Sequence, residues 1–174
     1  MTASASKTDK ETDPAAELLD LFYPFHYKGG MALEDTLRCG QLSRKQVAIL
    51  WLIRSEGEHG RRMRRKDIER LIQTWFEVSS SAITKALRSM ARPPLSLIQI
   101  VEDPRSAREK QVLFTPRGER FLLTMVTQGR QFLQQIVDQL SDEEISSGIH
   151  FLRRATAVQE HLLSQIAAHE GKRR

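Results

Sequence analysis

The chain has 174 residues, of which 40% are hydrophobic and 28% charged, enough for a packed soluble domain with helical extensions. No apolar run approaches the roughly 18 residues of a membrane-spanning helix, residues 1–13 lack the apolar centre of a secretory signal, and the single cysteine excludes an internal disulfide. The net charge of +5 is modest, but five cations crowd into the six positions from Arg61 to Lys66. Such a cluster favours binding to a polyanion.

The N-terminal region is predicted to be a flexible tail, residues 1–13, followed by an interrupted helix. Apolar residues recur at helical spacing from Pro14 to about Arg38, but Pro24 should kink or end the helix and Gly29-Gly30 should loosen it. Aromatic side chains gather around this break. They could form one wall of a small-ligand pocket, although packing at a subunit interface is the alternative that we favour. The residues are Phe22, Tyr23, Phe25 and Tyr27.

A helix-turn-helix is predicted in the middle of the chain. A capping box of Ser43 and Gln46 begins a first helix, which ends near Gly57. A short helix from about Arg64 to Trp75 follows, and a turn joins it to a helix over Val78–Ala91. Two helices joined by a short turn, the second exposing hydrogen-bond donors, are typical of a DNA-binding helix-turn-helix.

The helix over Val78–Ala91 carries the candidate recognition face. Its apolar residues fall on one side at the three-four spacing of a buried stripe. The other side has hydroxyls first and then cations, and it has no acid, so it can donate to phosphates and to base edges. Ser79 is the predicted N-cap and belongs to the same candidate surface. The outward residues are Ser80, Ser81, Thr84, Lys85 and Arg88.

The basic cluster lies at the start of the preceding helix. Cations at a helix N-terminus oppose the backbone dipole by about 0.3–1 kcal/mol each. Their placement therefore indicates a task such as holding phosphate, while a tolerated, solvated basic loop is an equally good interpretation. The candidate phosphate contacts are Arg62, Arg64, Arg65 and Lys66.

A β-hairpin and two long helices complete the chain. Period-two runs over Leu97–Glu102 and Glu109–Thr115 predict two strands. The polar tip between them, residues 103–108, contains Arg105 and Arg108, which could reach the negative potential of a minor groove. The helices from Thr115-Pro116 onward are apolar on wide faces, which indicates packing against a second copy.

These elements resemble the MarR family of bacterial transcription regulators over roughly residues 18–166. Residues 42–50 look like the family's second helix, residues 81–85 like its recognition helix, and residues 103–118 like its wing and the start of its fifth helix. The resemblance implies a homodimer whose recognition helices enter major grooves, with Arg108 as the wing arginine and Asp103 as an acid that supports the wing. Ser106 departs from the second acid that the family often has there.

The expected fold is therefore mostly α with a small β-hairpin wing. Residues 14–40 are predicted to form an N-terminal dimerisation region, residues 41–116 the winged helix-turn-helix domain, and residues 117–170 the C-terminal dimerisation helices. We expect a cytoplasmic, nucleoid-associated, bacterial homodimer that binds a palindromic operator in double-stranded DNA, most simply as a repressor, without cofactor, metal or membrane.

The family resemblance implies two kinds of signal that could regulate DNA binding, a small molecule and an oxidant. Some relatives respond to a small aromatic acid bound between the dimer helices and the DNA-binding lobe, for which Phe22, Tyr23, His26, Tyr27 and Trp51 are the candidates here. Others sense oxidants through a cysteine in the first helix, and Cys39, whose pKa Arg38 could lower, lies near the end of that region. An idle small residue is the interpretation that we favour for Cys39.

Two other classes of function fit the sequence less well. The winged helix could dock a partner protein without binding DNA. An enzyme finds little support, because the five histidines show no metal-ligand spacing and the chain has neither a glycine-rich phosphate loop nor a nucleophile elbow.

Overall fold

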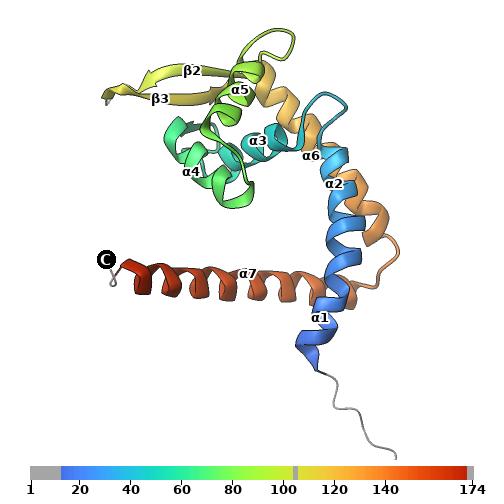
Figure 1. The fold of residues 1–174 in the computed structure, drawn as a ribbon. Helices are drawn as coiled ribbons and strands as arrows, with labels where there is room; N and C mark the ends of the chain where they lie inside the picture. Colours follow the sequence, from blue (N-terminus) through green and yellow to red (C-terminus); the bar gives the residue numbers. More distant parts are fainter. Residues whose placement is uncertain (1–12, 104–105, 172–174) are drawn as a thin grey trace, which may run out of the picture. The chain divides into compact units, whose positions relative to one another are not determined.

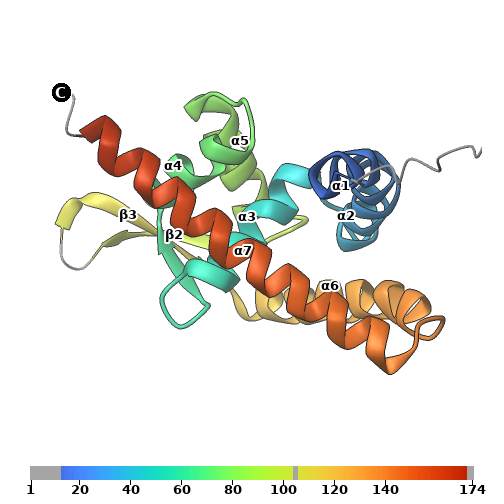
Figure 2. The ribbon, with the colours of Figure 1, turned by 90° about the horizontal axis from the view of Figure 1, so that it is seen from below.

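The computed structural model describes residues 13–103 and 106–171, and it confirms a mostly helical chain with a small sheet (Figures 1 and 2). The chain divides into two compact units, Met1–Arg130 and Gln131–Arg174. In chain order the elements are α1 (Pro14–Phe22), η1 (Tyr23–Gly30), α2 (Met31–Leu37), α3 (Arg44–Glu56), β1 (Arg62–Arg64), α4 (Arg65–Trp75), α5 (Ser80–Ala91), β2 (Ile98–Asp103), β3 (Ser106–Phe114), α6 (Pro116–Val137) and α7 (Asp142–Gly171).

The helix does not end at Pro24, which was one of the two predicted effects of this proline, because the chain stays helical from Pro14 to Leu37. Pro24 lies in the first turn of η1, a π-helical segment in which Met31 N–H donates to the carbonyl of His26, five residues earlier. The wider π turn changes the hydrogen-bond register next to the proline, so its missing N–H does not end the helix. Of the predicted tail, Asp13 is described, and it caps α1 by accepting from Ala15 N–H at 2.9 Å; residues 1–12 lie outside the described part.

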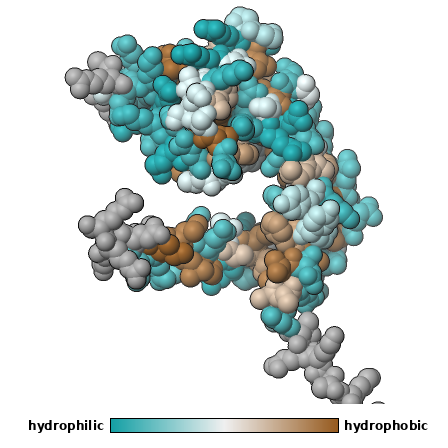
Figure 3. Space-filling view, in the orientation of Figure 1, coloured by the Kyte–Doolittle hydropathy of each residue, from teal (hydrophilic) through white to brown (hydrophobic). Residues whose placement is uncertain are grey.

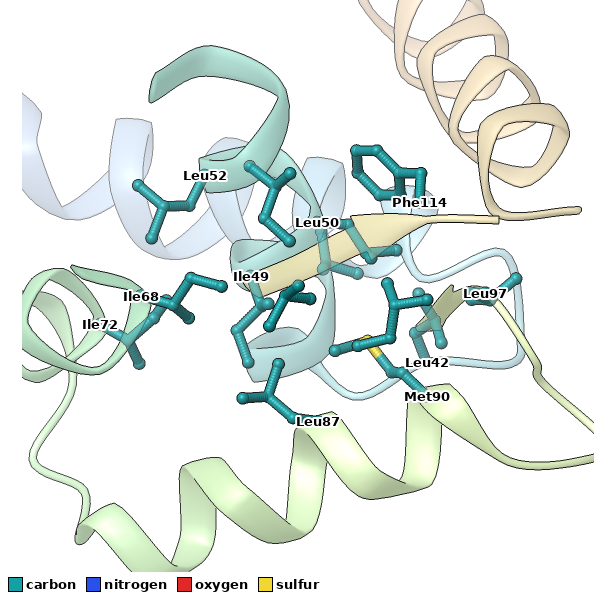
Figure 4. Close-up of a cluster of buried hydrophobic side chains, with 14 of the residues drawn as sticks. Leu42, Ile49, Leu50, Leu52, Ile68, Ile72, Leu87, Met90, Leu97 and Phe114 are labelled. Carbon is teal, nitrogen blue, oxygen red and sulfur yellow. The ribbon is translucent and has the colours of Figure 1, made fainter. Parts of the chain in front are cut away.

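One hydrophobic core holds α3, α4, α5 and the sheet together (Figure 4). Helix α3 is central because it buries residues on several sides, and the predicted capping box begins it: Ser43 Oγ accepts from Gln46 N–H at 3.3 Å, and Gln46 Oε1 accepts from Ser43 N–H at 2.9 Å. The same cluster contains buried side chains from α4, α5, β2, β3 and α6, so the position of α5 is set by packing. The fully buried members include Ile49, Leu50, Ile53, Ile68, Ile72, Leu87, Met90 and Val112.

The sheet has three antiparallel strands in the order β1-β3-β2, one more than the predicted hairpin. Strand β1 joins it by pairing Arg62 with Leu113 and Arg64 with Gln111. The Arg-Met-Arg of this strand alternates in polarity, but three residues are too few for a period-two pattern to predict a strand. Strand β3 also begins three residues before the predicted Glu109, at Ser106.

The second unit contains the end of α6 and the 30-residue helix α7. A capping box begins α7, since Ser141 Oγ accepts from Glu144 N–H at 3.3 Å and the Glu144 carboxylate accepts from Ser141 N–H at 2.8 Å. Hydrophobic side chains are exposed along the helix, as the brown residues of Figure 3 show. Among the described residues, no helix is long and apolar enough to cross a membrane.

Candidate nucleic-acid interface

Helix α5 has the two faces that the sequence predicts. Ser79 is its N-cap, and its Oγ accepts from Ala82 N–H at 3.3 Å. Ile83, Leu87 and Met90 are buried in the core. Ser80, Ser81, Lys85 and Arg88 are exposed on the opposite side. The core thus fixes the helix, and its polar face is left for a ligand.

The outward side of α5 lines an open groove of about 540 Å³. Three cations lie along it at helical spacing, and none of its lining residues is an acid. Within residues 13–103 and 106–171, no ion pair involves Lys85, Arg88 or Arg92, so their charges face the solvent. Sequence reasoning missed Ser89 and Arg92, although Arg92 lies four residues after Arg88 and continues the same face. The lining residues are Ser81, Thr84, Lys85, Arg88, Ser89 and Arg92.

Thr84 differs from its predicted role as a free donor. Its Oγ1 donates to the carbonyl of Ser80 at 2.8 Å and accepts from Arg65 Nη2 at 2.9 Å. Its single hydroxyl hydrogen is therefore already used. The second bond joins the start of α4 to the middle of α5, so Arg65 acts as a brace between the two helices of the helix-turn-helix.

The basic cluster is paired with acids of the same chain. Arg62 makes two bonds to the Glu58 carboxylate, at 2.6 and 3.0 Å, and Glu58 raises the pKa of its guanidinium. Lys66 Nζ lies 3.2 Å from Glu109 on β3, and Arg64 Nε lies 3.8 Å from the same carboxylate. These pairs offset the unfavourable helix dipole at the start of α4. They also connect β1 and α4 to the wing, a role that sequence reasoning did not foresee.

Asp103, which the family resemblance implies as a support of the wing, ends strand β2. Its side chain is buried, with 3% of the residue exposed, and Arg64 Nε lies 3.5 Å from its Oδ2. The β2–β3 register shifts between Glu102 and Asp103, and Asp103 pairs with Ser106. A buried carboxylate beside a guanidinium links the wing to the start of α4.

The two predicted wing arginines are described to different extents. Arg105 lies outside the described residues. Arg108 was expected in the hairpin tip, but β3 already includes it, because the strand begins at Ser106. The side chain of Arg108 lies outside the described part, so its minor-groove contact stays a prediction.

The aromatic residues around η1 form one surface cluster. The ring of His26 stacks on the ring of Phe22, with their centroids 5.1 Å apart, and meets the ring of Tyr27 edge-on, with the centroids 4.8 Å apart. The ring centroids of Tyr23 and Tyr27 are 5.5 Å apart. All four are exposed. Trp51, the fifth predicted pocket residue, lies on α3 and makes a different contact, with the Arg54 guanidinium 4.9 Å from its ring centroid.

The environment of Cys39 opposes the predicted activation. Burial raises the pKa of the Cys39 thiol, whereas a redox-sensing cysteine needs a low pKa. Arg38 does not supply the expected effect, because its guanidinium binds Asp35 at 3.0 Å and the carbonyl of Leu42 at 2.7 Å. The expectation that Arg38 lowers this pKa is therefore wrong.

Comparison with known proteins identifies the class of domain. Residues 42–118 match the family described as winged helix DNA-binding domain. This segment covers α3 to the first turn of α6, and with it the candidate interface. A sequence search of curated proteins found no match.

Solved structures extend the likeness to most of the chain. A MarR family protein from Bacillus stearothermophilus superposes with a TM-score of 0.68 at 18% identity, over 84% of this chain and 95% of that one. The wild-type apo form of MarR from E. coli gives 0.63 at 16% identity, over 83% and 98%. A mutant of S. aureus MepR bound to an oligodeoxyribonucleotide gives 0.55 at 18% identity, over 85% and 99%. The chain therefore has the fold of the MarR-family transcription regulators, which the sequence resemblance predicted.

Proposed function

We propose that this protein is a dimeric, sequence-specific DNA-binding transcription regulator, and most simply a repressor in the bacterial cytoplasm. The groove on α5 is the observation that carries the proposal, because three cations without ion pairs within the described residues lie on the exposed face of a recognition helix. Phosphates and guanine edges are the acceptors that such a row of donors fits in a major groove.

The proposed dimer would use the helices outside the winged domain. Residues 14–40 and 117–170 are the proposed dimerisation regions, and their exposed apolar side chains support this role. Leu18, Leu19 and Phe25 on the N-terminal helix are each more than half exposed, and α7 exposes several more. A two-fold dimer would present two α5 helices to the half-sites of a palindromic operator.

A small aromatic acid is the effector that the proposal includes. Such a ligand could stack on the exposed rings of Phe22, His26 and Tyr27, which already contact one another at aromatic distances. To relieve repression it would have to bind better to the form that cannot bind DNA. The raised pKa of its thiol makes Cys39 a poorer candidate for the signal.

The first prediction concerns the effect of salt concentration on the affinity for DNA. Binding of the full chain to the upstream DNA of its own gene should weaken steeply as salt rises, because each neutralised phosphate releases counterions and contributes about −0.9 to the log–log slope. Fluorescence anisotropy of a labelled duplex at a series of salt concentrations measures this slope. A flat line, or no binding at low salt, contradicts the proposal and leaves docking to a partner protein as the better function.

A triple variant assigns the binding to α5. Lys85→Ala/Arg88→Ala/Arg92→Ala should bind at least about 100-fold more weakly, since each charged contact to a base or phosphate contributes about 1–3 kcal/mol. Arg130→Ala, which removes an exposed cation from α6, is the control and should bind like the wild type. If Arg130→Ala loses about one third as much binding free energy as the triple variant, DNA responds only to net charge, because the control removes one positive charge and the triple variant removes three.

A further inference from the structure

We infer that α5 reads guanine through Lys85 and Arg88, and that Arg65 does not contact DNA but holds α5 in register through Thr84. The inference rests on the proposed function and deepens it, because it names the base class and separates the reading residues from a positioning residue. It is carried by the hydrogen bonds of Thr84 and by the composition of the α5 groove.

The groove is strongly biased toward donors. Its charged side chains are Lys85, Arg88 and Arg92, and it has neither a carboxylate nor an amide. Cytosine and adenine present amino donors in the major groove, and Asp, Glu, Asn or Gln usually read them. Guanine presents two acceptors, O6 and N7, which fit a guanidinium or an ammonium. The donors on α5 therefore favour guanine.

The spacing of the two cations adds a second constraint. Lys85 and Arg88 are three residues apart and lie on the same exposed side of α5. Three residues advance the helix by about 4.5 Å, close to the roughly 3.4 Å between base pairs. The two side chains thus reach neighbouring base pairs, and each half-site should contain two guanines within a step or two of each other.

Thr84, which also lines the groove, contributes differently. Its hydroxyl hydrogen is used by the carbonyl of Ser80, and the same oxygen accepts from Arg65 Nη2 at 2.9 Å. With its donor hydrogen used, Thr84 keeps for a base one acceptor lone pair and its methyl group, and the methyl group suits apolar contact with a thymine methyl. Glu69 lies 3.9 Å from the same nitrogen of Arg65 and helps to hold the guanidinium at Thr84.

The guanine assignment is tested with modified bases. A half-site is first enriched from a randomised duplex library by the purified full chain, and each enriched guanine is then replaced by 7-deazaguanine, which lacks N7, or by inosine, which keeps N7 and O6. The 7-deaza duplexes should bind about five- to 100-fold more weakly at the two read positions, and the inosine duplexes should bind like the parent. For the Arg88→Ala variant, 7-deazaguanine should no longer weaken binding at one of the two read positions. For the control variant Arg130→Ala, it should weaken binding at both positions, as it does for the wild type.

The outcomes separate the inference from the function it rests on. If the library yields no duplex that the protein retains, the proposed function fails, and the inference falls with it. If a motif is enriched but lacks paired guanines, or if 7-deazaguanine has no effect, DNA binding stands and guanine reading is overturned.

The role of Arg65 is tested by the salt slope. Arg65→Ala should weaken binding several-fold without changing the slope, because a brace makes no phosphate contact, whereas a lost phosphate contact would lower the slope by about 0.9. Thr84→Val should cause a similar loss that does not add to that of Arg65→Ala, and Thr84→Ser, which keeps the hydroxyl, should retain the brace. A lower slope or fully additive losses would overturn the positioning role, and thermal melting of each variant checks that the fold is intact.

Discussion

Replacing Gly118 by alanine is expected to lower the free energy of unfolding by about 2–4 kcal/mol, from overpacking and lost hydrogen bonds. A Cβ at this position would lie 1.8 Å from the carbonyl oxygen of Leu97, where β2 is about to begin. That carbonyl already accepts from Thr115 N–H at 3.0 Å and from Thr115 Oγ1 at 3.1 Å. Backbone atoms form the obstacle, so α6 must move and these bonds must lengthen.

Urea or thermal unfolding followed by circular dichroism measures the effect. For a chain of this size, the loss corresponds to a Tm lower by about 4–16 °C. Gly148→Ala is the matched control, because that glycine also lies in a helix, α7, but a Cβ added there would have no atom within 4 Å. It should leave stability unchanged or raise it by up to about 1 kcal/mol. Equal stability of Gly118→Ala and wild type would show that α6 does not dock tightly on Leu97.

The fold could be predicted where local physics decides it. Capping boxes at Ser43 and Ser141 mark helix starts because their side chains bond to backbone only three residues away. Strand β1 could not be found in this way. Its three residues become a strand only because residues 111–113, about fifty positions later, offer a free edge. Nor could the sequence show that η1 carries the helix past Pro24, since that depends on a change of hydrogen-bond register.

The candidate site also has a part that follows from local sequence and a part that depends on long-range contacts. The polar face of α5 follows from a helical period, so Lys85 and Arg88 could be named in advance. The partners of the basic cluster could not, because Lys66 meets Glu109 at a separation of 43 residues and Arg65 meets Thr84 at 19. A run of cations in the sequence indicates a single basic surface that is free to bind a ligand. In the structure, most of these cations form ion pairs with acidic side chains of the same chain. Only the long-range geometry distinguishes the cations that brace the domain from those left for a ligand.

The double variant Leu152→Lys/Leu163→Lys is expected to convert the proposed dimer into a monomer of 20.0 kDa. Leu152 and Leu163 are 52% and 58% exposed on α7. They are eleven residues apart, about three helical turns, and therefore share one face. A buried leucine contributes about 1.5–3 kcal/mol, and a two-fold dimer loses four of them. The dimer dissociation constant should therefore rise at least about a thousandfold.

Sedimentation equilibrium over a range of concentrations measures the change. Ala157→Lys/Ser164→Lys is the charge-matched control, because these two exposed positions lie about 120° around α7 from the two leucines. The control should stay dimeric. If the Leu152→Lys/Leu163→Lys variant also stays dimeric, the exposed residues of α1 and η1 are the better interface.

The monomeric variant also tests how the two recognition helices cooperate. In a dimer, the second half-site is bound from a high effective concentration, which can strengthen binding by about 10²–10⁴ over a single half-site. The variant should therefore lose this advantage and bind a palindromic duplex no better than a single half-site, although the α5 groove is unchanged. Full affinity for the palindrome in a monomeric variant would show that DNA itself can assemble the pair, and that α7 is not needed to space the two helices.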